Sequence, residues 1–256
     1  MDTLTVNGMV LSAMPIGEYD RRVVILTTDI GRISAFVKGA RRPNSSLLAA
    51  ARPFSMGKFT LYAGRDSYTV QAAVIKEHFE AVCADVTKMA YGCYFMEAAG
   101  FASEENEEAK ELLNLLYFSL RALENKAISD ELVKLIFEIR LFAVCGVYPQ
   151  VFECNICKKK FVQGWLDMNR GNSLCTDCKS SDTEGQIYLD ASSAYTLQYI
   201  LTAPVGKLYT FLLEEKVQNT LRNVTAKWRK RYYPREFKSL TVLEQMRQML
   251  PKEGMF

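Results

Sequence analysis

The hydrophobic pattern has a period of two from the N-terminus to about residue 80. Between residues 32 and 38, Ile33, Ala35 and Val37 alternate with polar or larger side chains, as in a strand with one buried face. Similar short segments lie at 9–13, 23–28, 58–62 and 67–71. We expect Pro15 to end the first of them. The pattern therefore predicts about five strands.

One helix is expected among these strands. In the segment 45–52, Ser45 can cap a helix, the alanines favour one, and Pro53 would end it. Five short strands with a helix between the third and the fourth is the order of an OB-fold, a small and partly open barrel. We therefore predict an OB-fold β-barrel over residues 1–80. An isolated five-stranded sheet is the alternative.

From residue 84 the apolar residues follow a helical period. Ser129 and the acids after it open one helix, and Gly146 with Pro149 closes it. Further helices are expected near 107–120, 191–202, 215–231 and 240–250, the last capped by Ser239. The predicted fold class is α+β with several domains. The barrel is followed by an all-helical domain over residues 81–256, with an inserted four-cysteine zinc module at about 150–182.

Two Cys-x-x-Cys pairs, separated by 17 residues, are the strongest local signal: Cys154, Cys157, Cys175 and Cys178. Each pair can aim both sulfurs at one ion, and a loop or hairpin between them can bring the second pair across. Four thiolates complete the shell of a structural Zn²⁺. Two disulfides, or four unrelated core cysteines, are the alternatives. We expect the other three cysteines to be buried fillers, namely Cys83, Cys93 and Cys145.

The surroundings of the two pairs agree with a structural metal. Four lysines would offset the negative charge of a zinc tetrathiolate, at positions 158, 159, 160 and 179. A catalytic zinc keeps an open position, whereas four cysteines fill the shell here. The chain's one histidine, His78, begins a His-Phe-Glu sequence that imitates half of a zinc deaminase signature. That signature also needs a proline before its Cys-x-x-Cys, and this chain has Glu153 there.

Charge is unevenly distributed, although 32 basic and 29 acidic residues give a net charge of only +3. From Ile30 to Arg65 there is no acid, and the basic residues are Arg32, Lys38, Arg41, Arg42, Arg52, Lys58 and Arg65. Phe36 shares a strand face with Arg32 and Lys38, and Tyr62 shares one with Lys58. Cations for phosphates, interleaved with rings that stack on bases, indicate a surface for single-stranded nucleic acid. The residues 39–45 would extend it as a flexible loop. The alternative is a solvated face with its aromatics in the core, as we expect for Phe59.

A second basic cluster lies near the C-terminus. On a helix, one apolar stripe is formed by Val217, Leu221, Val224 and Trp228. The residues that flank it, as candidates for contact with DNA or a partner protein, are Arg222, Lys227, Arg229, Lys230 and Arg231. Three interpretations remain open for this segment: a buried helix with a solvated back, a DNA contact, or a site for an acidic peptide.

Several classes of protein are disfavoured. The chain contains neither G-x-G-x-x-G nor G-x-x-x-x-G-K-[ST], and one histidine leaves most acid–base schemes without their usual base. We therefore expect no catalysis and no small-molecule substrate. The most apolar stretch, residues 132–148, contains Lys134, Glu138 and Arg140, so no membrane span is expected. The first residues do not resemble a signal peptide, and we expect a cytoplasmic protein.

Several short sequences resemble one known family. Residues 17–21 (Gly-Glu-Tyr-Asp-Arg) and 38–42 (Lys-Gly-Ala-Arg-Arg) are similar to the N-terminal domain of the RecO family of bacterial DNA repair and recombination mediators. Tyr148-Pro149, leading into the first cysteine pair, and residues 237–240 (Phe-Lys-Ser-Leu) resemble its C-terminal domain. The likeness runs along nearly the whole chain.

The resemblance implies a non-enzymatic mediator of recombinational repair. Such proteins bind single- and double-stranded DNA and anneal complementary strands. With the partner RecR they assist loading of the RecA recombinase onto DNA coated by single-strand-binding protein. The resemblance implies a cytoplasmic, nucleoid-associated location and a zinc that stabilises the fold. The alternative function is a zinc-containing interaction scaffold, whose basic C-terminal helix binds an acidic peptide.

Overall fold

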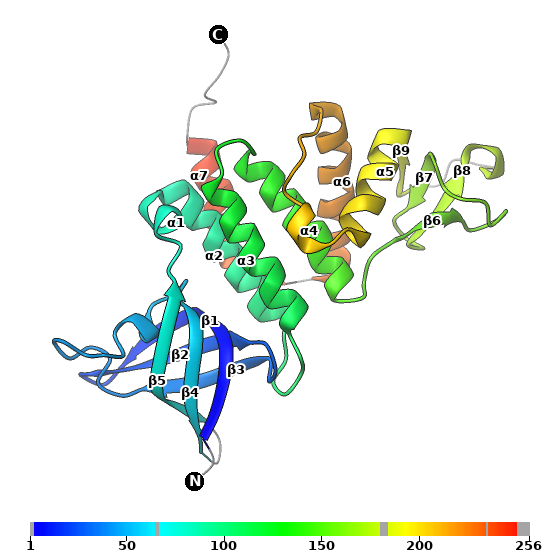
Figure 1. The fold of residues 1–256 in the computed structure, drawn as a ribbon. Helices are drawn as coiled ribbons and strands as arrows, with labels where there is room; N and C mark the ends of the chain where they lie inside the picture. Colours follow the sequence, from blue (N-terminus) through cyan, green and yellow to red (C-terminus); the bar gives the residue numbers. More distant parts are fainter. Residues whose placement is uncertain (1–2, 65–66, 180–183, 234, 250–256) are drawn as a thin grey trace. The chain divides into compact units, whose positions relative to one another are not determined.

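The computed structural model describes residues 3–64, 67–179, 184–233 and 235–249 (Figure 1). The chain divides into two compact units. The first consists of Met1–Glu124 with Phe237–Phe256, and the second of Asn125–Glu236. None of the described helices is long and apolar enough to cross a membrane.

A closed barrel opens the first unit. Its strands are β1 (Thr3–Ile16), β2 (Asp20–Thr27), β3 (Arg32–Val37), β4 (Met56–Ala63) and β5 (Tyr68–Glu77), in the order β1-β2-β3-β5-β4. β1 pairs with both β2 and β4 and so closes the sheet, and only β3 and β5 run parallel. Ile33, Ala35 and Val37 are fully buried inside, together with Phe59. The strand order is that of an OB-fold, so the predicted fold class is confirmed.

The first strand is longer than predicted. Pro15 does not end it, because β1 runs to Ile16, and Pro15 pairs with Arg21 of β2. β4 covers β1 only from Thr3 to Met9. At Pro15 the strand therefore has a neighbour on one side only, and a missing N–H is tolerated on the open side.

The predicted helix over 45–52 is wrong. Only a 3₁₀ turn, η1 (Ala49–Ala51), forms there. Its carbonyls accept hydrogen bonds from side chains, since Arg21 Nη1 donates to Ala51 O over 2.7 Å and Ser55 Oγ donates to Ala49 O over 2.7 Å. Ala50 and Ala51 are buried against the barrel core. These tertiary contacts override the helical propensity of the alanines.

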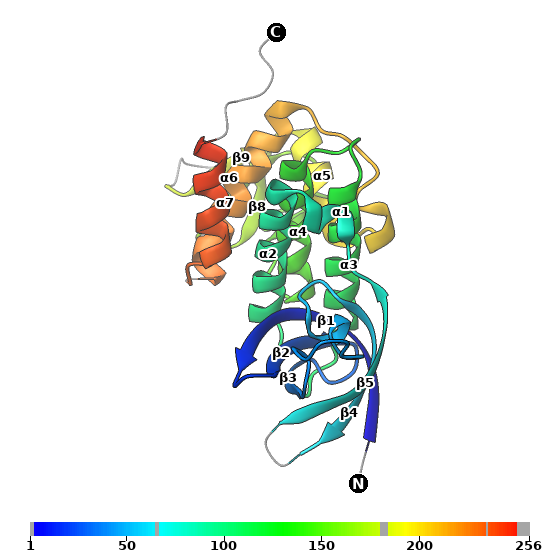
Figure 2. The ribbon, with the colours of Figure 1, turned by 90° about the vertical axis from the view of Figure 1, so that its left-hand side faces the viewer.

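Four helices complete the first unit: α1 (Glu80–Ala84), α2 (Val86–Phe101), α3 (Lys110–Glu124) and α7 (Lys238–Met249). Figure 2 shows α7 packed along α2. Ser239 is not the cap of α7, because the helix begins at Lys238. The backbone N–H groups of Lys238 and Ser239 instead donate to the Glu97 carboxylate on α2, over 3.3 and 2.9 Å. A carboxylate from another helix therefore caps α7.

The second unit combines helices with a small sheet. Its helices are α4 (Asp130–Val144), α5 (Ala191–Thr202) and α6 (Glu215–Tyr232), with the 3₁₀ turns η2 (Thr176–Cys178) and η3 (Val205–Lys207). Ser129 caps α4 as predicted, since its Oγ accepts from Leu132 N. The sheet has the order β6-β8-β7-β9, formed by β6 (Gln150–Cys154), β7 (Gly164–Asp167), β8 (Asn172–Cys175) and β9 (Gln186–Leu189).

Candidate nucleic-acid surface and cysteine cluster

The sheet of the second unit brings the two cysteine pairs together. Cys154 ends β6, Cys175 ends β8, and these two strands are neighbours in the sheet. All four sulfurs lie within 4.8 Å of one another, and the Sγ atoms of Cys157 and Cys175 are 3.8 Å apart. The predicted grouping is therefore confirmed. An S–S bond is about 2.05 Å long, so the shape is that of four thiols around one point and not of disulfides.

The cluster has the chemistry of a metal site. Burial alone would raise the pKa of the Cys154 thiol, but hydrogen bonds from the backbone N–H groups of Cys175, Cys157 and Ile156 lower it to about 6. The sulfurs of Cys175 and Cys157 raise the pKa of Cys178 to about 12. A second thiolate is thus unfavourable without a cation among the sulfurs. Four such donors around one point fit a tetrahedral thiolate-bound ion.

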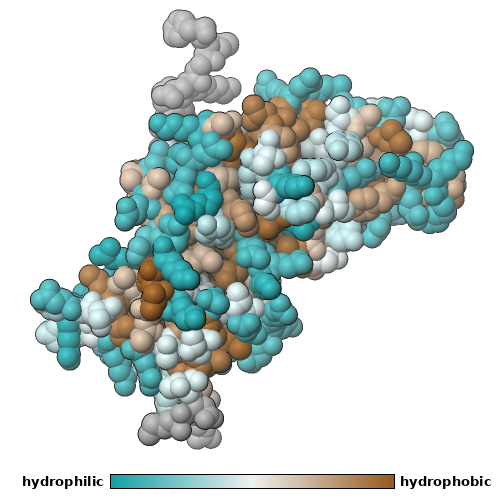
Figure 3. All heavy atoms as spheres, viewed as in Figure 1, coloured by the Kyte–Doolittle hydropathy of each residue, from teal (hydrophilic) through white to brown (hydrophobic). Residues whose placement is uncertain are grey.

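Two of the four lysines beside the cysteines are engaged in local contacts. Lys158 Nζ lies 3.5 Å from Glu153 Oε1, and Lys179 Nζ lies 3.9 Å from the centre of the Trp165 ring. Hydrophilic side chains cover much of this end of the second unit, at the right of Figure 3. Of the three remaining cysteines, Cys93 and Cys145 are half-buried. Cys83 is exposed, so its prediction as a buried filler is wrong.

Strand register gathers four residues on the outer face of the barrel. Arg22 of β2 pairs with Phe36 of β3, Phe36 pairs with Thr69 of β5, and Thr69 pairs with Tyr62 of β4. Paired residues point to the same side of a sheet. Their chain neighbours Val23, Ala35, Val70 and Leu61 are buried inside, so the four residues face outward. We call Arg22, Phe36, Thr69 and Tyr62 the outer row.

The outer row contains one cation that sequence reasoning missed. Arg22 is exposed, and its Nε donates to Ser34 Oγ over 2.6 Å. Arg22 lies outside the acid-free stretch of residues 30–65 and only two residues after Asp20. The charge pattern therefore gave no reason to include it among the candidate DNA-binding residues. Its place beside Phe36 depends on the β2–β3 register, which a pairing argument over the two strands would have found.

The loop after β3 carries three predicted cations next to the outer row. Lys38, Arg41 and Arg42 are exposed. Arg41 N donates to Tyr19 O over 2.9 Å, and the Arg42 guanidinium lies 5.3 Å from the centre of the Tyr19 ring. Gly39 N donates to the Asp20 carboxylate. These contacts attach the loop to the β1–β2 turn, and its flexibility stays a prediction.

The remaining predicted cations of the barrel lie elsewhere. Arg32 Nη1 donates to Gly100 O at the end of α2 over 2.7 Å. Lys58 is exposed between Asn7 and Val74, its partners on the adjacent strands. Arg52 lines a pocket, and Arg65 lies outside the described residues. The six predicted cations other than Arg65 form no ion pair with the residues that the structure describes.

The C-terminal basic cluster is largely engaged within the second unit. Arg229 Nη1 forms an ion pair with Glu138 Oε1 over 2.6 Å, and Arg231 Nη1 donates to Met168 O over 2.6 Å. Arg222 donates to the side chains of Asn219 and Gln218 on its own helix. The apolar stripe of α6 is buried, including Trp228. Among the five candidates, Lys227 and Lys230 are exposed, and their side chains form no hydrogen bond or ion pair with the residues that the structure describes.

The fold and the site together define a protein that joins an OB-type barrel to a helical region with a metal-binding type of cysteine cluster. Comparison with known proteins agrees with this class. The family model "Recombination protein O N terminal" matches residues 1–79, and "Recombination protein O C terminal" matches residues 83–241.

Individual relatives match along most of their length. "DNA repair protein RecO" of Acetivibrio thermocellus is 29% identical over 245 residues, which cover 95% of this chain and 97% of the relative. The protein of the same name from Alkaliphilus metalliredigens is 30% identical over 218 residues, covering 85% and 88%. That of Clostridium perfringens is 26% identical over 238 residues, covering 93% and 96%. The chain therefore belongs to the RecO family of DNA repair proteins.

Proposed function

We propose that this chain binds single- and double-stranded DNA and anneals complementary strands during recombinational repair, without catalysing a covalent step. The observation that carries the proposal is the outer row beside the loop cations. Phe36 and Tyr62 offer rings to bases, and Arg22, Arg41 and Arg42 offer charge to phosphates. This combination of rings and cations is the common means of holding a single strand.

The proposal includes the partners of the pathway. The chain would act with RecR to assist RecA loading onto DNA covered by single-strand-binding protein, in the cytoplasm at the nucleoid. Support comes from the family, because the relatives from Acetivibrio thermocellus and Alkaliphilus metalliredigens are both named DNA repair protein RecO. The alternative function, a scaffold that binds an acidic peptide on α6, is less favoured, because Arg229 and Arg231 are already used in internal contacts.

We also propose that the metal is Zn²⁺ and that its role is structural. Cys154, Cys157, Cys175 and Cys178 would hold it, and the ion would fasten β6 to β8. Four cysteines leave no open position for water or substrate. We therefore do not propose that this ion takes part in a reaction on DNA.

Strand annealing by the purified chain, without any nucleotide, tests the function. With about five phosphate contacts, log affinity for single strands should fall against log salt with a slope near −3.5, about 0.7 per contact. The charge reversals Arg41→Glu and Arg42→Glu together should flatten this slope and slow annealing. A charge-matched control is Lys110→Glu with Lys126→Glu, because both lysines are exposed and lie off the barrel. Equal affinity and slope in both double variants would remove the barrel surface from the proposal.

A further inference from the structure

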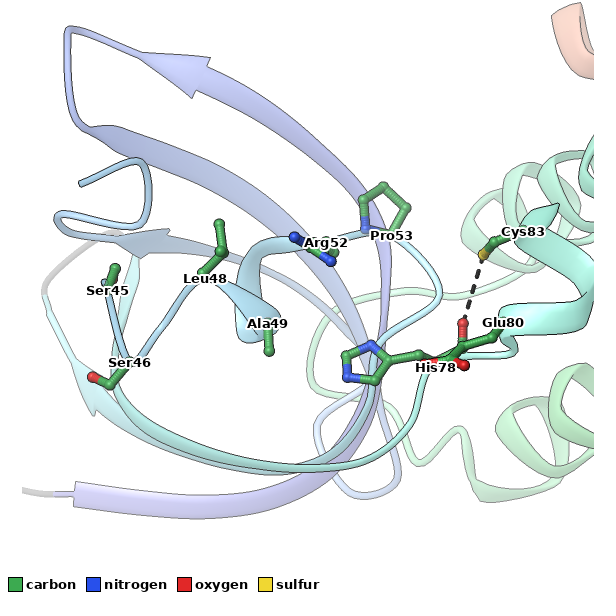
Figure 4. Close-up of a pocket in the computed structure, with 9 residues that line it drawn as sticks. All are labelled: Ser45, Ser46, Leu48, Ala49, Arg52, Pro53, His78, Glu80 and Cys83. Carbon is green, nitrogen blue, oxygen red and sulfur yellow. Dashed lines mark hydrogen bonds between the residues drawn. The ribbon is translucent and has the colours of Figure 1, made fainter. Parts of the chain in front are cut away.

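A pocket of about 560 Å³ lies in the first unit, between the segment before β4 and the start of α1 (Figure 4). One wall is apolar, with Leu48, Ala49 and Pro53. The opposite wall carries His78 and Cys83. A volume of a few hundred Å³ with an apolar wall and a few polar groups is typical of a small-ligand site.

Arg52 supplies a cation to this pocket. Its side chain is exposed, and it forms no ion pair with the residues that the structure describes. Its backbone is held at the pocket, since Arg52 N donates to Ala49 O and Ser55 N donates to Arg52 O. The guanidinium, which lines the pocket, can bind a phosphate with two parallel hydrogen bonds.

His78 supplies an acceptor of known orientation. Buried Ser55 has one hydroxyl proton, and it is donated to Ala49 O over 2.7 Å. Ser55 Oγ therefore has no proton left to donate to His78. The contact of 3.1 Å between Ser55 Oγ and His78 Nδ1 therefore requires that Nδ1 donates. In the neutral ring Nε2 is then left as an acceptor, and none of the described residues meets it. The backbone N–H of His78 donates to the Glu77 carboxylate and fixes this segment further.

We propose that this pocket binds one unpaired nucleotide of a DNA strand, with its phosphate on Arg52 and the edge of its base at His78 Nε2. The base would lie against Leu48, Ala49 and Pro53. Every base carries at least one N–H on its pairing edge, so the site tolerates any sequence. Glu80, also in the pocket wall, disfavours a phosphate on its own side and so orients the nucleotide towards Arg52.

DNA is favoured over a protein side chain because the pocket continues the proposed DNA surface. Ser45 and Ser46 belong to the pocket wall, and Ser45 N donates to Arg42 O over 3.2 Å. The loop cations and the pocket wall are thus only a few residues apart in the sequence. A DNA strand that is bound by the loop cations can therefore extend into the pocket. The inference rests on the proposed DNA binding and adds a consequence. A base paired in a duplex has its edge occupied, so the pocket would select single strands.

Cys83 provides the test, because its exposed thiol lies in the pocket. We would measure its alkylation by iodoacetamide in the full metal-loaded chain, by mass spectrometry of the peptide. Burial, and then Glu124 and Glu80, raise the pKa of Cys83, so the reaction is run in alkaline buffer. The ligands are oligo(dT) of about 20 nucleotides, the same length of abasic sugar–phosphate strand, and a duplex, with binding followed separately by anisotropy.

Bound oligo(dT) should slow Cys83 alkylation about fivefold or more, whereas the abasic strand and the duplex should not. Arg52→Gln should abolish the protection and weaken oligo(dT) binding about tenfold. Lys76→Gln removes a cation from β5 outside the pocket and should keep the protection. If oligo(dT) binds the wild-type chain and alkylation is unchanged, or if the abasic strand protects equally, the pocket proposal fails and DNA binding stands. If oligo(dT) does not bind at all, both fail.

Discussion

Phe36 on β3 and Tyr62 on β4 both pair with Thr69 of β5, so their side chains face outward with one strand between them. Two inter-strand spacings separate their Cα atoms by about 10 Å. Each ring can therefore receive a different base of one strand. This relationship follows from the barrel closing in the order β3-β5-β4, which places residues 26 positions apart in the chain on one row.

Removal of either ring should weaken single-strand binding. We expect Phe36→Ala and Tyr62→Ala each to cost about 1–3 kcal/mol of binding free energy for oligo(dT), with little change in the salt slope, since no charge is removed. Fluorescence titration at several salt concentrations measures both quantities. Tyr195→Ala is the control, because Tyr195 is an exposed aromatic of the second unit. Wild-type affinity in a variant that carries both Phe36→Ala and Tyr62→Ala would show that the rings do not contact bases.

Loss of one cysteine should release the metal. Cys154→Ser removes the most buried ligand, and we expect zinc content to fall to near zero and the melting temperature to decrease. Metal analysis and thermal unfolding check this. Chelation of the wild-type chain should expose four further reactive thiols in a titration. Cys93→Ser should leave the metal in place, because Cys93 is outside the cluster. A full complement of zinc in Cys154→Ser would contradict the four-cysteine site.

The Glu138–Arg229 pair should be important for the stability of the second unit. Glu138 is nearly buried, with 5% of its side chain exposed, and Arg229 lies 2.6 Å away. Glu138→Ala leaves two partly buried cations, Arg229 and Lys134, without this partner, which should lower the free energy of unfolding by about 3–5 kcal/mol. Glu153→Ala breaks the exposed pair with Lys158 and should cost less than about 1 kcal/mol. Denaturant unfolding distinguishes the two, and similar losses would argue against a buried pair.

Asp190 should make stability depend on pH. Ser193, whose backbone N–H donates to the carboxylate over 2.9 Å, and then Lys216 lower the pKa of Asp190 at the start of α5. A lowered folded-state pKa stabilises the chain above the unfolded value of about 3.9, and the stabilisation is lost as the pH falls through the folded value. Asp190→Ala should therefore cost about 1 kcal/mol at neutral pH. The difference from the wild type should shrink in acid, and a difference independent of pH would contradict it.

Local signals in the sequence predicted those parts of the fold that depend on neighbouring residues. Ser129 caps α4 through a residue three positions later, and each cysteine pair is one short turn. The alternation of Ile33, Ala35 and Val37 likewise needs only one strand. Hydrophobic periods and capping rules describe relations between residues a few positions apart, so they predict features of this kind.

The errors involve contacts between distant residues. Ser239 looked like a cap, but Glu97, which is 142 positions away, supplies the acceptor. The alanines of η1 looked helical, but Arg21 and Ser55 take their carbonyls. Arg22 entered the candidate surface only through the β2–β3 register. Because these arrangements depend on tertiary pairing, single-sequence patterns do not contain them.

The cap of α7 by Glu97 has a consequence for biosynthesis. The first unit is built from both ends of the chain, and the second is continuous within it. Domains fold as they leave the ribosome, so the second unit can be complete while α2 still waits for its partner helix. The packing of α2 against α7 can therefore form only after residues 238–249 have been synthesised, which is later than the whole of the second unit.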